Sequence, residues 1–135
     1  MAIRTDANSR YTETHEWVRL EGDLAVCGIT DYAQEHLSDI VYVELPAEDD
    51  EFAKGEVYGV VESVKAASDC YLPVSGTIVE INEELEAEPE VVNADPYGAG
   101  WFVKVQLSDP GELDALMDET AYATFAAEQE DDEEE

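Results

Sequence analysis

The sequence predicts a mainly β fold, either a β-sandwich or a flattened barrel, with a short helix after the second strand and a helical C-terminus. Three observations predict it. Short apolar runs separated by turn residues fill most of the chain, one late run alternates with a period of two, and helical patterns occur only near residue 31 and after residue 109. At 135 residues the chain fits one domain, which we place at residues 1–128, followed by a disordered acidic tail at 129–135.

The first elements are a hairpin and a helix. EWVRL (residues 16–20) and LAVCGI (residues 24–29) are predicted strands, and Gly22 between them supplies the tight turn. A helix follows in TDYAQEHLSD, because the Thr30 hydroxyl can cap its free amides and Asp31 interacts favourably with the helix dipole in the first turn.

Four further strands follow this helix. IVYVELP (residues 40–46) ends at a proline, and KGEVYGVVES is a strand that begins at Gly55. SDCYLP and GTIVEIN are separate strands, because Pro73 and Gly76 interrupt the apolar run between them.

The end of the chain combines one strand with helices. WFVKVQL (residues 101–107) alternates between apolar and polar side chains, as a strand with one buried face does. In DPGELDALMD, Asp109 is the predicted N-cap and Glu112 completes a capping box, so we expect a helix there and a second one in ETAYATFAAEQ.

The charge of the chain limits its partners. The sequence has 35 acidic residues against 6 Lys and Arg, a formal net charge of -29, which repels nucleic acids and anionic membranes. No signal peptide and no membrane-spanning apolar run is visible, so we expect a cytoplasmic protein. The acids are spread along the whole chain, a distribution that favours a halophilic protein whose surface is screened by salt.

The two cysteines do not form a recognisable motif. Cys27 and Cys70 lie in apolar stretches without a C-x-x-C spacing, so the simplest interpretation is two buried, reduced thiols. A zinc site that combines them with His15 and His36 would need these residues to converge without the usual ligand spacings, and no metal site is predicted. An enzyme that uses either cysteine as a nucleophile remains an alternative, which requires a reactive thiol.

The segment VVESVKAASDCYLPVSG contains one of only three lysines in the chain. Strand-like alternation on both sides of SVKAAS places Lys65 at the tip of a hairpin, among small residues that leave room for an approaching surface. An ordinary exposed turn lysine explains this pattern as well as a lysine that an enzyme acylates does.

The residues around Lys65 resemble the lipoyl-attachment hairpin, with a proline eight and a glycine eleven positions after the lysine. Over almost the whole length, the sequence is similar to the H proteins of the glycine cleavage system. The similarity is carried by THEWVR, GITDYAQEHLSDIVYVELP, ESVKAASD, VNADPYGAGW and GELDALMDETAY, in that order. It implies a barrel-sandwich hybrid of two antiparallel sheets, in a single lipoyl-carrier domain with lipoate bound covalently to Lys65.

The resemblance also implies a function without catalysis. A carrier of this family shuttles the aminomethyl group of glycine from glycine decarboxylase, which uses pyridoxal phosphate, to the aminomethyltransferase, which uses tetrahydrofolate. Dihydrolipoamide dehydrogenase then reoxidises the lipoyl group, and lipoate-attaching enzymes load it. We expect a monomer that acts in this system. A lipoyl relay, or a carrier for another lipoyl-dependent system, is the alternative.

Three residues are candidates for contact with the lipoyl arm. The amine of the loaded arm is cationic and labile to hydrolysis, so a cleft lined by carboxylates would protect it. From the motifs of the family, Glu16 and Asp69 are the expected carboxylates, and the Thr14 hydroxyl is the expected third contact. In a chain with 35 acidic residues, either carboxylate can equally be a solvated surface group.

Overall fold

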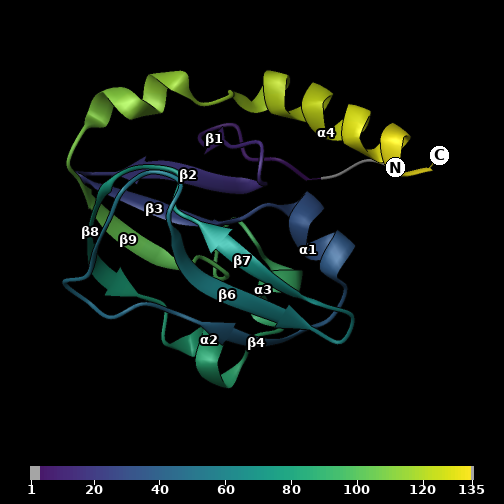
Figure 1. Cartoon of the computed structure of the whole chain (residues 1–135), viewed down its shortest axis with the longest axis horizontal. Helices are drawn as coiled ribbons and strands as arrows, with labels where there is room; N and C mark the ends of the chain where they lie inside the picture. Colours follow the sequence, from purple (N-terminus) through teal and green to yellow (C-terminus); the bar gives the residue numbers. More distant parts are fainter. Residues whose placement is uncertain (1–3, 135) are drawn as a thin grey trace.

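Two antiparallel sheets enclose the main core of the protein (Figure 1). The computed structural model describes residues 4–134, with side chains through Gln129. The six-stranded sheet has the order β1 (Arg10–Tyr11), β2 (Glu16–Glu21), β3 (Leu24–Ile29), β9 (Val103–Leu107), β8 (Gly76–Ile81) and β5 (Glu51–Phe52). The three-stranded sheet has the order β4 (Ile40–Glu44), β6 (Val57–Ser63) and β7 (Ala67–Tyr71). The predicted mainly β fold, with a short helix after the second long strand and a helical C-terminus, is confirmed.

The local signals at the start of the chain act as expected. β2 and β3 pair antiparallel up to Glu21 and Leu24, and Gly22 in the turn has a φ of 63°, a left-handed conformation that glycine adopts without steric strain. Helix α1 (Asp31–Leu37) begins after Thr30, whose hydroxyl accepts a hydrogen bond of 3.2 Å from the Ala33 amide.

The core lies between the two sheets and consists mainly of branched aliphatic side chains. Val18, Val43, Val61 and Val105 each expose 1% or less of their surface. These residues come from both sheets. In β9 burial alternates as predicted, with Val103 and Val105 buried, but Phe102, expected on the opposite face, is also buried. The long strands β2 and β3 are buried over several consecutive residues, because the core covers one of their faces and the second apolar cluster covers the other.

A second apolar cluster holds the C-terminal helix against the outside of the larger sheet. Helix α4 (Glu119–Glu134) begins above β1 and extends along the upper right of the view, beyond the ends of β1 and β2 (Figure 1), and Tyr122 stacks on Tyr11 with ring centroids 4.5 Å apart. Trp17 from β2 joins the same cluster and is fully buried. This packing brings the C-terminal part of the chain to the strands that follow its N-terminus.

The segment before α4 differs from the predicted helix. Residues Pro110–Ala115 form a 3₁₀ helix, and the Asp109 side chain accepts a hydrogen bond from the Gly111 amide. The capping box is absent, because the Glu112 carboxylate instead accepts hydrogen bonds from the amide and the hydroxyl of Ser75, at 2.7 and 2.8 Å. A tertiary contact has replaced the local one.

Several elements lie outside the sequence prediction. The short strands β1 and β5 were missed, as were helices α2 (Glu84–Ala87) and α3 (Val91–Ala94) in the charged tract before Trp101. Each has only two to four residues, too few to show a period. Helix α4 continues through Glu134, where a disordered acidic tail was expected; glutamate is a good helix former, so an acidic composition permits this extension.

Candidate functional site

Lys65 lies at the tip of the β6–β7 hairpin, as predicted. The register pairs Glu62 with Ala67, and Ser63 closes the turn: its hydroxyl accepts hydrogen bonds from the amides of Lys65 and Ala66, at 3.1 and 3.0 Å. The hairpin tip is therefore a defined turn that presents one lysine.

The side chain of Lys65 is accessible. Residues 64–69 are all exposed, and Val64 next to the lysine exposes 68% of its surface. The Lys65 ammonium donates a hydrogen bond of 2.9 Å to the carbonyl oxygen of His36, near the end of α1. The sequence had given no partner for this ammonium, because His36 is distant in sequence and contributes only its backbone. One exposed hydrogen bond leaves the amine open to an acylating enzyme.

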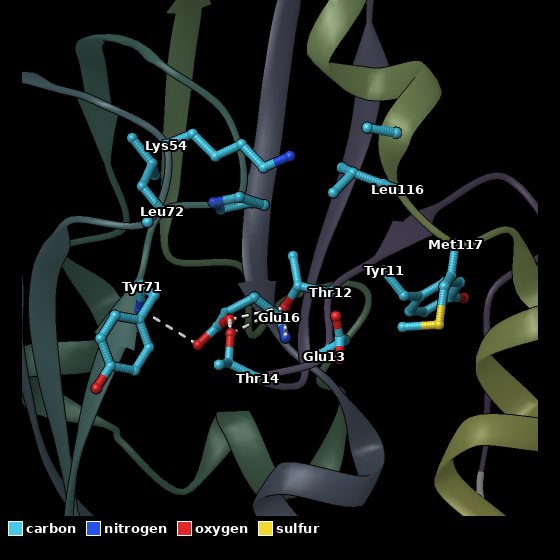
Figure 2. Close-up of a pocket in the computed structure, with 13 residues that line it drawn as sticks. Tyr11, Thr12, Glu13, Thr14, Glu16, Lys54, Tyr71, Leu72, Leu116 and Met117 are labelled. Carbon is cyan, nitrogen blue, oxygen red and sulfur yellow. Dashed lines mark hydrogen bonds between the residues drawn. The ribbon is translucent and has the colours of Figure 1, made fainter.

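Glu16 is the more deeply buried of two buried acids among the described residues, the other being Asp31. It is the first residue of β2 and exposes 2% of its surface. Its Oε1 accepts hydrogen bonds from the hydroxyls of Thr12 (2.9 Å) and Thr14, and its Oε2 accepts one from the Tyr71 amide (3.2 Å) (Figure 2). Tyr71 belongs to the edge strand β7, so this single carboxylate connects the two sheets.

The backbone before Glu16 forms a tight loop that places these hydroxyls. The Thr12 amide donates to the Glu16 carbonyl (3.0 Å), and the His15 amide donates to the Thr12 carbonyl (3.1 Å). His15 has a φ of 68°, a left-handed conformation in which histidine is enriched among non-glycine residues. The THEW motif therefore has a structural meaning, since it forms, together with the preceding Thr12, the turn that brings two threonine hydroxyls to one carboxylate.

Burial raises the pKa of Glu16 from its ordinary value of 4.5 to about 7, because desolvation disfavours the carboxylate. The hydrogen bonds from Thr14, Tyr71 and Thr12 oppose this shift only in part. Among the residues that the structure describes, neither a lysine nor an arginine forms an ion pair with Glu16. Within this range, the site is a buried acid without a lysine or arginine partner.

A cavity of about 270 Å³ opens next to Glu16. Its other lining residues come from the Thr12 loop, from the segment around β7 and from the C-terminal segment: Tyr11, Thr12, Glu13, Thr14, Lys54, Gly55, Tyr71, Leu72, Pro73, Ala115, Leu116 and Met117. Figure 2 shows the Lys54 side chain extending toward Leu116, with its ammonium pointing away from the Glu16 carboxylate. The cavity is mostly apolar, with an acid at one end.

A second cavity adjoins the first. It has about 380 Å³ and shares Glu13 and Thr14 with the first cavity. It is also lined by Ser68 of β7 and by His36, the residue whose carbonyl accepts a hydrogen bond from Lys65. Lys65 itself lines neither cavity, so the two cavities extend from Glu16 to a residue that contacts the lysine.

Of the three candidates for contact with an arm, the structure brings together two. Thr14 and Glu16 are in direct contact, whereas Asp69 lines neither of the two cavities described above. Asp69 is exposed on β7 opposite Val60, and its neighbour Ser68 faces the second cavity instead. Thr12 was missed by the sequence analysis, because a threonine four residues before an acid has no distinctive pattern.

The thiols are far from reactive. Cys27 and Cys70 are both buried and unpaired, and burial raises the pKa of each thiol well above its ordinary range. A nucleophilic cysteine needs the opposite, an accessible thiol with a lowered pKa. Within residues 4–134, no group of three or more His, Cys, Asp or Glu side chains could hold a metal ion. None of the helices in this range is long and apolar enough to span a membrane.

Comparison with known proteins agrees with this arrangement. The sequence model of the family "Glycine cleavage H-protein" matches residues 9–129. The chain belongs to the glycine cleavage H-protein family. It is 55% identical over 120 residues to the glycine cleavage system H protein of Thermotoga maritima, covering 89% of this chain and 97% of that protein.

Other H proteins give the same result. The H protein of Halothermothrix orenii is 54% identical over 121 residues, covering 90% of this chain and 94% of its own length. The crystal structure of the H protein of Mycobacterium marinum superposes with a TM-score of 0.82 at 39% identity, covering 89% of this chain and 97% of that one. The predicted barrel-sandwich arrangement of two sheets is thereby confirmed.

Members of the H-protein family are non-catalytic carriers of the glycine cleavage system and hold lipoate on a lysine. The chain is therefore a carrier subunit and not an enzyme. The buried, unreactive state of Cys27 and Cys70 agrees with this conclusion.

Proposed function

We propose that Lys65 is the lipoylated lysine and that the loaded arm enters the cavity at Glu16. The observation that supports the attachment is the position of Lys65 at an exposed, structured hairpin tip. Lys54 and Lys104 lack this setting: Lys54 follows the two-residue strand β5, and Lys104 lies within β9, 3.8 Å from Glu80.

The cavity fits the end of a lipoyl arm that bears an amine. Its apolar walls suit an alkyl chain, and Glu16 offers a carboxylate acceptor that no lysine or arginine of the described residues pairs with. An arm amine beside Glu16 would form a charge-assisted hydrogen bond away from bulk water. We keep Thr14 as a further contact and Asp69 as a contact made from outside this cavity.

The partners follow from membership of the glycine cleavage system. We propose that the protein acts as a cytoplasmic monomer that receives the aminomethyl group from glycine decarboxylase and delivers it to the aminomethyltransferase. Dihydrolipoamide dehydrogenase would reoxidise the dithiol, and a lipoate-attaching enzyme would modify Lys65. In this scheme the lipoyl group supplies the redox and transfer chemistry, while the protein supplies placement.

Mass spectrometry of protein from its native cells tests the site. We expect one lipoyl adduct in the intact mass, and peptide mapping should place it in VVESVKAASDCYLPVSG at Lys65. Purified decarboxylase and aminomethyltransferase should then load and unload this protein. Lipoylation without any loading would indicate a lipoyl relay or another lipoyl-dependent system, and bare Lys65 would contradict the proposed attachment.

We also propose that the acidic surface is adapted to high salt. The net charge of -29 on 135 residues implies strong self-repulsion of the folded chain, and salt at 1 M shortens the Debye length to about 3 Å. We expect the thermal midpoint, measured by circular dichroism, to rise substantially between low and molar potassium chloride. An equal midpoint in both solutions would contradict the halophilic interpretation.

A further inference from the structure

The hydrogen bonds of Glu16 leave one acceptor position unfilled. A carboxylate has about four acceptor sites, two on each oxygen. Oε1 accepts from the hydroxyls of Thr12 and Thr14, so its sites are filled, whereas Oε2 accepts only from the Tyr71 amide. The remaining site is therefore on Oε2, the oxygen that Figure 2 shows on the Tyr71 side of the carboxylate.

Thr12 binds Glu16 at both of its ends. Its hydroxyl oxygen accepts a hydrogen bond of 3.1 Å from the Glu16 amide and donates one of 2.9 Å to Glu16 Oε1. A hydroxyl has a single hydrogen, so this donation leaves none for the Thr14 oxygen 3.1 Å away. Thr14 donates its own hydrogen to Oε1, so both hydroxyls converge on the same carboxylate oxygen.

We propose that Thr12 is a positioning residue, which holds the Glu16 carboxylate with Oε1 filled and directs the free acceptor site of Oε2 at the amine of the arm. Nothing else in the described chain holds both the backbone and the carboxylate of Glu16 through one side-chain atom. The contact between Oε2 and the arm amine rests on the proposed function. The effect on Glu16 itself can be measured without any arm.

The effect of Thr12 has a definite sign. Its hydroxyl donates to the ionised carboxylate and so lowers the pKa of Glu16, against the larger opposing effect of burial. The titratable groups that line the same cavity or affect it electrostatically come from several elements: Tyr11, Glu13, Cys27, Lys54, Tyr58, Cys70, Tyr71 and Tyr122. None of them donates a hydrogen bond from its side chain to Glu16.

The test uses two substitutions at one position. Thr12→Val removes the hydroxyl and keeps the shape, whereas Thr12→Ser keeps the hydroxyl. In the full-length, unlipoylated protein labelled with ¹³C-glutamate, we expect Thr12→Val to raise the pKa of Glu16 by about one pH unit, since it removes a hydrogen bond to a charged group. Thr12→Ser should restore the original value.

A matched control separates positioning from a general loss of hydroxyl groups. Thr77→Val makes the same chemical change on β8, outside the Glu16 cavity, and should leave the Glu16 titration unchanged. In the lipoylated, loaded protein, Thr12→Val should also shorten the lifetime of the carried amine near pH 7, and Thr12→Ser should not.

Two results would overturn the proposal. One is a Glu16 pKa in Thr12→Val equal to that of the Thr77→Val control, and the other is a serine variant that behaves like the valine variant. If instead the pKa rises while the lifetime stays constant, Thr12 positions Glu16 but the arm does not use it. If Glu16→Gln also leaves the lifetime of the carried amine unchanged, the proposal that the arm enters the Glu16 cavity is wrong, whereas the role of Thr12 in positioning Glu16 still holds.

Discussion

We expect the substitution Lys65→Arg to abolish lipoylation and with it all carrier activity. Arginine can still donate a hydrogen bond to the His36 carbonyl, so the hairpin keeps its structure. Its guanidinium stays protonated at any physiological pH and offers no nucleophilic amine to an acylating enzyme. Incubation with a lipoate–protein ligase, lipoate and ATP, followed by intact-mass measurement, should show the parent protein with one adduct and the variant with none.

The same chain supplies the control for this experiment. Lys54→Arg is the same change at another exposed lysine, and it should leave the extent of lipoylation unchanged. Equal unfolding midpoints for the three proteins would show that the hairpin substitution acts on chemistry and not on folding. An adduct that persists in Lys65→Arg would move the attachment site to another lysine.

We expect Glu16→Gln to shorten the lifetime of the carried amine by roughly tenfold to hundredfold, the value of a lost charge-assisted hydrogen bond in a buried site. Lipoylation of Lys65 should be unaffected, because Lys65 lines neither the Glu16 cavity nor the second cavity that adjoins it. The lifetime is measured as the decay of loaded protein by mass spectrometry. Glu13→Gln, an exposed acid on the rim of the same cavity, is the control.

The pH dependence of this lifetime has a predictable direction. The pKa of Glu16 is about 7 without an arm amine beside it, and the arm amine favours the ionised carboxylate and lowers this pKa in the loaded form. Protection of the amine should therefore persist below pH 7 and decline once Glu16 is protonated. In Glu16→Gln the lifetime should lose this dependence, and a parental profile would remove Glu16 from the site.

The same substitution should stabilise the protein at alkaline pH. Because burial raises the pKa of Glu16 from 4.5 to about 7, the folded state keeps a proton that the unfolded chain releases between these values. The protonated Glu16 side chain therefore contributes its full share of the folding free energy below pH 4.5. About 3 kcal/mol of stability is lost as the pH rises from 4.5 through 7. In denaturant unfolding in molar salt, the free energy of unfolding of Glu16→Gln should exceed that of the parent protein by up to this amount at pH 8. The two values should be equal at pH 4.

The stability gain would have a functional explanation. A buried carboxylate that pairs with no lysine or arginine of the described residues is costly for the fold, and glutamine fills the same space without the charge. Its carbonyl can accept from the Tyr71 amide while its amide group donates to the threonine hydroxyls. The presence of a glutamate at position 16 is then explained by the group that it binds, because the acid does not stabilise the domain.

The sequence predicted the larger elements because their signals are local. The turn at Gly22, the Thr30 cap and the hairpin tip at Lys65 each depend on residues within a few positions of one another. The capping box at Glu112 failed for the opposite reason, since Ser75 lies 37 positions away and competes for the same carboxylate. The short strands β1 and β5 exist only because longer strands pair with them.

The site was predictable only where a motif carried it. The resemblance to the family pointed to four residues, of which the structure joins two through one hydrogen bond: Lys65, Asp69, and the bonded pair Glu16 and Thr14. The burial of Glu16 could not be deduced from its neighbours, because the Tyr71 amide and the C-terminal wall of the cavity come from distant segments. Asp69, four positions after Lys65, is exposed on β7 and lines neither of the two cavities.

The wall of the Glu16 cavity has a consequence for the growing chain on the ribosome. The hairpin uses only residues 57–71, so it is complete in the middle of synthesis. The cavity needs Met117, whose backbone forms hydrogen bonds of 2.9 and 3.0 Å with Tyr11 at the other end of the sequence. During translation, Lys65, the proposed attachment site, therefore leaves the ribosome before Met117, which completes the wall of the cavity proposed to receive the arm.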